Sequence, residues 1–119
     1  MISATLRIPA RQPLLDRILR DLKAMIGPAS VASGCITCRL YQEVGESSSL
    51  MLCQQWESEQ ALRAYIRSDN FRLLLGLMEA ASEVPELRFD TLSHSRGLDL
   101  VSELRAEANS GRDITNYGS

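Results

Sequence analysis

The strongest constraint on the fold is the stretch from Leu50 to Met78, in which a strand pattern changes directly into a helical one. Residues alternate between two faces of a strand, so Leu50–Trp56 presents one row made of every second side chain. The members of that row are Leu50, Leu52, Gln54 and Trp56. The only tryptophan of the chain therefore ends a row that is otherwise mostly apolar.

Two helices are predicted immediately after this strand. Ser58 is a good N-cap for the first helix, and either Ser68 or Asp69 can cap the second, because their side-chain oxygens accept free backbone N–H groups. After each cap the apolar residues recur at helical spacing. They are Ala61, Leu62, Tyr65 and Ile66 in the first helix and Phe71, Leu74, Leu75, Met78 and Ala81 in the second.

The remaining elements follow from periodicity and from turn residues. Alternation predicts a first strand over residues 2–8, and a single apolar stripe predicts an amphipathic helix over residues 13–26 that Gly27-Pro28 stops. A long second strand is predicted over residues 34–44, and a fourth strand over residues 86–94.

The resulting order of strand, helix, two strands, helix pair and strand is typical of ferredoxin-like βαββαβ folds. We therefore predict an α+β domain over residues 1–96, with a four-stranded antiparallel sheet and helices on one face. Residues 97–119 are predicted to form a short helix and then, from about Asn109, a polar tail that is mobile or lies on a neighbour.

The uncovered face of such a sheet must meet water or another sheet. Here neither face is uniformly polar, since one parity presents Met51 and Cys53 and the other presents Ile36, Cys38 and Leu40. Two sheets packed face to face would bury these groups, so we predict a homodimer.

Composition excludes several classes of partner. A net charge of −2 and a pI near 5.4 offer no general attraction for phosphate backbones or anionic lipid, so neither nucleic acid nor a membrane surface is expected. No run of about 18 apolar residues spans a bilayer, and the start lacks a signal-peptide pattern, so a cytoplasmic location is expected. Cys35 and Cys38 form a CxxC spacing, but a strand would place them on opposite faces, and no metal site is predicted.

A family resemblance rests on residues around Trp56. The string Trp56-Glu57-Ser58, followed by Ala61-Leu62, Tyr65, Ser68 and Phe71, resembles the antibiotic biosynthesis monooxygenase family of dimeric α+β barrels. The segment containing Gly34, Cys35, Leu40 and Tyr41 is similar to the second strand of that family.

The resemblance implies oxidation of a small quinol-type aromatic by molecular oxygen, with no metal, flavin or haem. That chemistry needs a dry cavity, a group that accepts a phenolic proton and a donor that holds the developing anion. Tyr65 and Asn70 stand where many members carry histidine, and Leu75 stands where haem-degrading members carry their axial histidine. Haem ligation by that scheme is therefore not expected.

Each candidate site residue has a functional and a structural interpretation. Trp56 and Tyr65 are predicted to line the pocket, Arg88 could hold an anionic oxygen, and His94 could carry a proton. The substrate-binding candidates are Tyr41, Phe71 and Leu74. The alternatives are a core tryptophan, edge tyrosines, a salt-bridged arginine and a surface histidine.

Two functions follow from these observations. The first is a monooxygenase-like protein with a pocket between sheet and helices; the second is a non-catalytic dimeric binding or stress-associated protein on the same scaffold. Whether the chain is an enzyme stays open between them. If Leu62, Phe71 and Leu74 fill the space beside Trp56, no molecule of quinol size can enter there.

Overall fold

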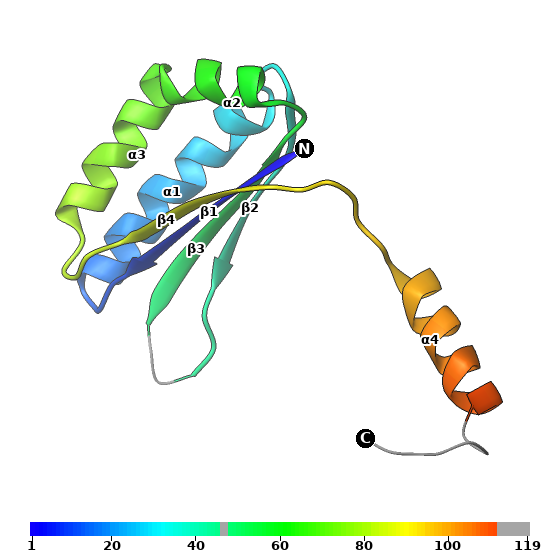
Figure 1. The fold of residues 1–119 in the computed structure, drawn as a ribbon. Coiled ribbons are helices and arrows are strands. Elements are labelled where there is room, and N and C mark those ends of the chain that lie inside the picture. Colours follow the sequence, from blue (N-terminus) through cyan, green and yellow to red (C-terminus); the bar gives the residue numbers. More distant parts are fainter. Residues whose placement is uncertain (46–47, 112–119) are drawn as a thin grey trace.

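The structure is a computed structural model that describes residues 1–45 and 48–111. Its elements follow the predicted order, including the helix predicted at the C-terminal end (Figure 1). They are β1 (Ile2–Pro9), α1 (Leu14–Ser30), β2 (Cys35–Gln42), β3 (Ser49–Trp56), α2 (Glu59–Ile66), α3 (Asp69–Ala80), β4 (Glu86–Thr91) and α4 (Leu98–Gly111).

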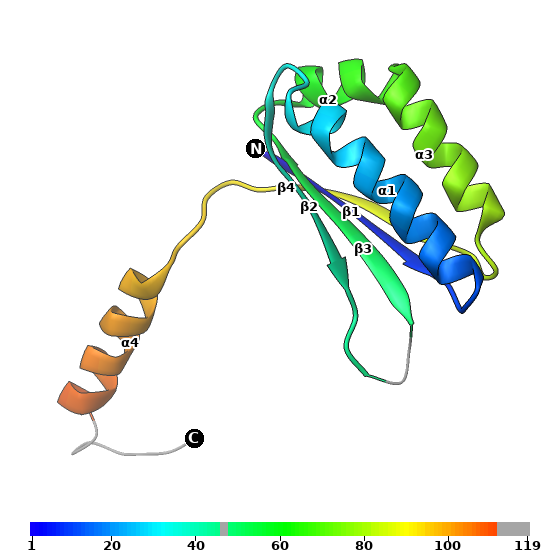
Figure 2. The same ribbon diagram turned by 180° about the vertical axis from the view of Figure 1, so that it is seen from behind.

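The strands form one antiparallel sheet in the order β2-β3-β1-β4. Helices α1, α2 and α3 cover one face of this sheet, and the views from front and back show the other face without a helix (Figures 1 and 2). The predicted ferredoxin-like α+β fold is confirmed.

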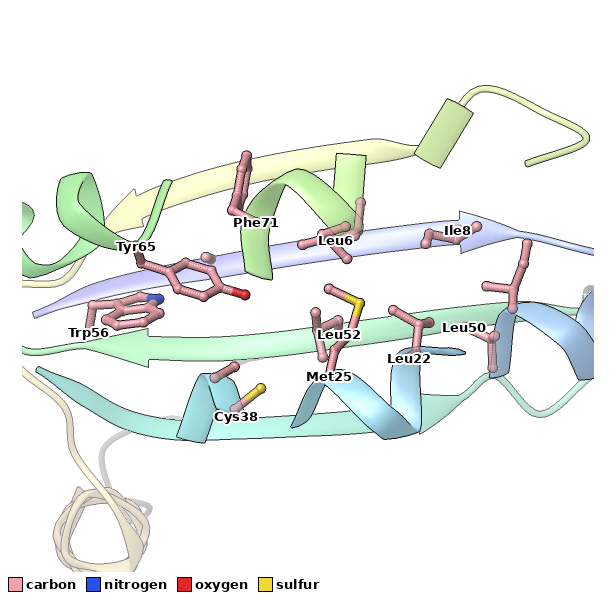
Figure 3. Close-up of a cluster of buried hydrophobic side chains, with 14 of the residues drawn as sticks. Leu6, Ile8, Leu22, Met25, Cys38, Leu50, Leu52, Trp56, Tyr65 and Phe71 are labelled. Atoms are coloured by element: carbon pink, nitrogen blue, oxygen red, sulfur yellow. The ribbon is translucent and has the colours of Figure 1, made fainter. Parts of the chain in front are cut away.

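The two central strands pair along their whole length, from Ile2 opposite Trp56 to Pro9 opposite Ser49. In each strand one of the two predicted alternating rows is buried against the helices (Figure 3). The buried residues of these rows are Ile2, Ala4, Leu6 and Ile8 in β1 and Leu50, Leu52, Gln54 and Trp56 in β3.

Helix α1 passes through the point where the sequence predicted its end. Pro28 lies inside the helix, which continues to Ser30, so the predicted stop at Gly27-Pro28 is wrong. In a helix a proline clashes with the Cβ of the residue before it, but Gly27 has no Cβ. Continuing the helix past Pro28 also buries Ala29 in the core. Pro28 is thereby placed on the helix surface, beside the grooves described below.

The strand ends also differ from the prediction. β4 stops at Thr91 instead of continuing to residue 94, because its partner β1 begins at Ile2, opposite Thr91. One further bond joins the N–H of Leu92 to the carbonyl of Met1, at 2.8 Å. β2 is likewise shorter than predicted, and its register shifts between Cys35 and Thr37.

Two serines cap the helix pair as predicted. The Ser58 side chain accepts a hydrogen bond from the Ala61 N–H at 3.1 Å, and Ser68 accepts one from the Phe71 N–H at 3.3 Å. The Ser68 hydroxyl also donates to the Tyr65 carbonyl at 2.6 Å, so one residue closes α2 and opens α3.

Gly34 sets the distance between the start of β2 and helix α2. It has a φ of +85°, and a Cβ built on it would collide with the Ala61 Cβ. Its carbonyl accepts the Glu57 N–H at 2.9 Å. Glycine is required here both by backbone conformation and by the close approach of α2.

Helix α4 is longer than the short helix predicted, and it stands apart from the sheet at the end of an extended segment (Figures 1 and 2). Its side chains from Leu98 to Ser110 are all exposed. Arg96 fixes its first turns through bonds to Asp99 at 2.7 Å and Glu103 at 2.9 Å. The predicted polar tail lies mostly within residues 112–119, outside the described residues.

Candidate functional site

A line of four hydrogen-bonded side chains crosses the layer between the sheet and helices α2 and α3. We call Trp56, Gln54, Tyr65 and Asn70 the polar chain. The Trp56 indole N–H donates to Gln54 Oε1 at 3.2 Å, and Gln54 Nε2 donates to the Tyr65 hydroxyl at 3.2 Å. The Tyr65 hydroxyl donates to Asn70 Oδ1 at 2.6 Å.

Chemistry fixes the direction of this chain. An indole N–H can only donate, so it must meet the oxygen of Gln54, and the amide nitrogen of Gln54 must then face Tyr65. Tyr65 accepts that bond, and its own proton must go to an oxygen, which sets the orientation of the Asn70 amide. All donors therefore point from the buried Trp56 toward Asn70.

Burial keeps this chain neutral. Burial raises the pKa of the Tyr65 hydroxyl, an effect that the hydrogen bond from Gln54 only partly opposes. The Tyr65 ring lies 4.6 Å from the Trp56 ring and meets Phe71 edge-on at 5.7 Å (Figure 3). Tyr65 is thus a rigidly held hydrogen-bond donor at neutral pH rather than a base.

The space between the sheet and the helix pair is almost filled. The cavity there, which we call the inner cavity, has a volume of only about 10 Å³, enough for about one water molecule. The predicted pocket of quinol size is therefore absent at this place in the structure. Its lining is apolar except for Gln54: Ala4, Leu6, Leu52, Gln54, Leu62, Phe71, Leu74, Leu87 and Phe89.

Larger spaces lie on the outer side of the helices, where α1 and α3 run side by side (Figure 2). The α1–α3 groove has a volume of about 320 Å³ and is lined by Asp21, Ala24, Met25, Pro28, Asn70, Leu73 and Leu77. A second hollow, the α2 groove, measures about 240 Å³ and is lined by Pro28, Ala32, Ser33, Ala61, Ala64, Tyr65, Ser68 and Asn70. Pro28 and Asn70 border both.

The structure brings only some of the predicted site residues together. Trp56 and Tyr65 share the polar chain, and Phe71 and Leu74 line the inner cavity. The other candidates lie elsewhere. Arg88 is largely exposed and pairs with Asp90 at 3.0 Å, while His94 is exposed beside Ser93.

Tyr41 lies opposite Met51 on the sheet face that no helix covers, and 49% of it is exposed. Catalytic or binding roles for Tyr41, Arg88 and His94 stay predictions.

Gln54 is the site residue that sequence reasoning missed. It is 4% exposed and connects Trp56 with Tyr65, and its Nε2 also donates to Cys38 Sγ at 3.6 Å. The available signal was a single amide in the buried row of an apolar strand. A buried amide in such a row needs polar partners, which is a reason to look for a network.

The two cysteines of the CxxC spacing share one face, contrary to the prediction. The bulge between Cys35 and Thr37 places Cys35 opposite Trp56 and Cys38 opposite Gln54, both on the helix-covered side. Burial raises the pKa of both thiols, which disfavours reactive thiolates. In residues 1–45 and 48–111, no cluster of three His, Cys, Asp or Glu side chains could hold a metal ion.

The fold is a ferredoxin-like α+β domain with the polar chain inside it. Comparison with known proteins identifies the family of this domain. Residues 1–74 match the model of the antibiotic biosynthesis monooxygenase family. The chain belongs to this family. No curated protein matches its sequence.

Solved structures with the same fold share little sequence with this chain. A proposed antibiotic biosynthesis monooxygenase from Deinococcus radiodurans is 7% identical with a TM-score of 0.75, over 82% of this chain and 97% of that one. A protein from Mycobacterium tuberculosis is 18% identical with a TM-score of 0.71, over 81% and 98% of the two chains. SnoaB, a cofactor-independent oxygenase from Streptomyces nogalater, is 14% identical with a TM-score of 0.67, over 79% and 94%.

None of the described helices is long and apolar enough to cross a membrane.

Proposed function

We propose that this chain is a cofactor-independent, monooxygenase-like protein that takes a small phenolic aromatic of the quinol type. The observation that carries this proposal is the polar chain inside a fold of the monooxygenase family. It presents Gln54 as the polar group in an otherwise apolar inner cavity, and Trp56 and Tyr65 hold Gln54 in one orientation. A substrate oxygen placed there would take over the Gln54 N–H that otherwise donates to Cys38 Sγ at 3.6 Å, while the bond to Tyr65 keeps the amide in position.

The inner cavity must enlarge to admit such a molecule. Its outer wall is formed by Leu87 and Phe89 of the edge strand β4, and 41% of Phe89 is exposed. β4 pairs on one side only and is six residues long. Separation of Phe89 from Phe71 and Leu74 is therefore the proposed way in.

The reaction would draw its electrons from the substrate. For an anthrone, the methylene carbon gives two hydrogens and four electrons to molecular oxygen. One oxygen atom forms the new carbonyl, and the other leaves as water with both hydrogens. The polar chain would hold the substrate oxygen during this exchange, and the apolar walls would exclude bulk water.

A second function is supported by the chemistry of the polar chain, whereas the inner cavity, at about 10 Å³, must enlarge for either function. The groups of the polar chain are neutral amides, an indole and a tyrosine whose pKa is raised. None of these accepts a phenolic proton readily at neutral pH. A binding protein that kept the scaffold without turnover has the same features.

Oxygen uptake separates the two functions. The purified protein is mixed with an anthrone or a menaquinol in an oxygen electrode, beside Gln54→Leu and Trp56→Phe variants. Uptake above buffer that Gln54→Leu abolishes supports the oxygenase. Binding of these substrates without uptake above buffer supports the binding protein. If the protein shows neither binding nor uptake, both functions are overturned.

We also propose a homodimer joined through the helix-free face of the sheet, in the cytoplasm. Met51 and Cys53 are half-buried on that face and stand beside Tyr41 and Thr5 of the neighbouring strands. Light scattering at micromolar concentration tests the assembly, and Met51→Glu should convert a dimer to a monomer. A wild-type mass of one chain would overturn it.

A further inference from the structure

The polar chain has a free end that the proposed oxidation does not use. Asn70 Oδ1 is taken by the Tyr65 hydroxyl, and Asn70 Nδ2 donates no hydrogen bond to any residue among 1–45 and 48–111. Because every donor in the chain points the same way, Oδ1 is held toward Tyr65, and the two N–H groups of Nδ2 are left without a partner among these residues at this end. Asn70 borders both outer grooves, so the residue stands where the two meet.

The surroundings of this donor suit a flat apolar ligand. Besides Asn70, the α1–α3 groove is lined by the apolar residues Met25, Pro28, Leu73 and Leu77, together with Ala24 and one carboxylate, Asp21. The groove volume of about 320 Å³ is at the lower end of the range for small-molecule pockets. Pro28 adds a rigid wall, and 63% of Leu73 is exposed without a ligand.

We infer that the α1–α3 groove is a binding site for an aromatic molecule that carries a hydrogen-bond acceptor, such as a ketone oxygen, which takes the N–H of Asn70. The ring system lies against Leu73, Leu77 and Pro28. The site is separate from the inner cavity and does not depend on turnover there. Ligand groups that can only donate, such as an N–H, are disfavoured against Nδ2, because both partners would then be donors.

The orientation of Asn70 is what gives this site its preference. An isolated surface asparagine can turn its amide to suit either a donor or an acceptor. Here a turned amide would place N–H₂ against the Tyr65 hydroxyl, which already accepts from Gln54, and the tyrosine proton would lose its acceptor. The buried Trp56 thus fixes, through Gln54 and Tyr65, the orientation of the Asn70 amide and therefore which ligand groups it can bind.

The test uses acetonaphthone as the probe and ethylnaphthalene as its match without an acceptor, with binding followed by backbone amide shifts of the full chain. The ketone should bind with shifts centred on Leu73 and Leu77, and about tenfold more tightly than the hydrocarbon, the factor expected for one hydrogen bond. Asn70→Asp should weaken ketone binding by a similar factor, because a carboxylate still accepts from Tyr65 but offers no donor.

Matched variants separate the site from a general effect on folding. Leu73→Glu should abolish binding, whereas Leu75→Glu, on an exposed residue of the same helix outside the groove, should leave it unchanged. Any of three results would overturn the inference: no ketone binding at millimolar concentration, equal affinity of Asn70→Asp, or shifts centred on Leu87 and Phe89. A dispersed amide spectrum of each variant shows that it is folded.

Discussion

The two sides of helix α3 differ in how much space they leave for a ligand. Toward the sheet, Phe71 and Leu74 pack so closely that the inner cavity holds about one water molecule. Toward α1, Leu73 and Leu77 border a groove of about 320 Å³. The larger of these two spaces therefore lies outside the layer between sheet and helices, where the family resemblance predicted the pocket.

The same hydrogen-bonded chain serves both sides. Gln54 faces the inner cavity, and Asn70 faces the grooves, with Tyr65 between them. A change at Tyr65 should consequently be felt on both sides, whereas a change at a leucine should be felt on one. The experiments below use this difference, beginning with the largest expected effect.

Neighbouring leucines of α3 give the sharpest contrast. Leu74→Ala should lower the free energy of unfolding by about 2–5 kcal/mol, because it leaves a cavity in a packed core. Leu73→Ala should change it by less than about 0.5 kcal/mol. The exposed fractions are 2% for Leu74 and 63% for Leu73. Urea unfolding measures both, and equal losses would show that the two sides of α3 do not differ.

Tyr65→Phe should cost about 1–3 kcal/mol, because the Gln54 amide loses its acceptor inside the core. The aromatic packing with Trp56 and Phe71 is retained in this variant. Asn70→Ala removes the other partner of the hydroxyl, so the double variant should lose less than the sum of the single losses. Strict additivity in the double-mutant cycle would mean that the two residues are not coupled.

Stability should fall in alkaline solution. Tyr65 has a raised pKa in the folded state, so above about pH 10.0, its ordinary value, the unfolded chain loses the proton while the folded chain keeps it. Unfolding then becomes more favourable as pH rises toward the folded pKa. The buried Cys38 and the half-buried Cys35 and Cys53 also have raised thiol pKa values, so they act similarly above about pH 9.0.

Tyr65→Phe isolates the tyrosine contribution to this pH dependence. Its unfolding midpoint should fall less steeply than that of the wild type above pH 10, as measured by denaturation at several pH values. Parallel slopes would mean that burial does not perturb Tyr65.

The smallest effect is expected for α4, a helix whose side chains are exposed all round. Ending the chain after Arg96 should leave the free energy of unfolding within about 0.5 kcal/mol of the full-length value, since surface changes away from packed features have effects of this size. A loss of several kcal/mol on truncation, measured under the same conditions, would contradict a domain that ends near residue 96.

The elements could be predicted from sequence where one local pattern dominates. Alternation in Leu50–Trp56 and the caps at Ser58 and Ser68 survive folding unchanged. Prediction failed where two preferences compete. Pro28 favours a helix end, but Gly27 removes the clash and Ala29 is buried in the core.

The candidate site was predictable only in part. Trp56 and Tyr65 carry their own signal as aromatic residues at apolar positions. Their connection does not, because it depends on Gln54 in the same strand and on where α2 crosses the sheet. The bulge at Cys35 is invisible in the alternation of the strand, and it brings Cys38 next to Gln54. The role of Asn70 could not be predicted either, because its amide is oriented by the hydroxyl proton of Tyr65.

The conformation of Gly34 has a consequence for how the whole layer can vary. Gly34 has no side chain between its backbone and Ala61, so α2 packs directly on the start of β2. A methyl group at this position would lift the near end of α2, and with it the ring of Tyr65, away from Trp56. The alignment of the whole polar chain therefore depends on a residue that contributes no atom to it.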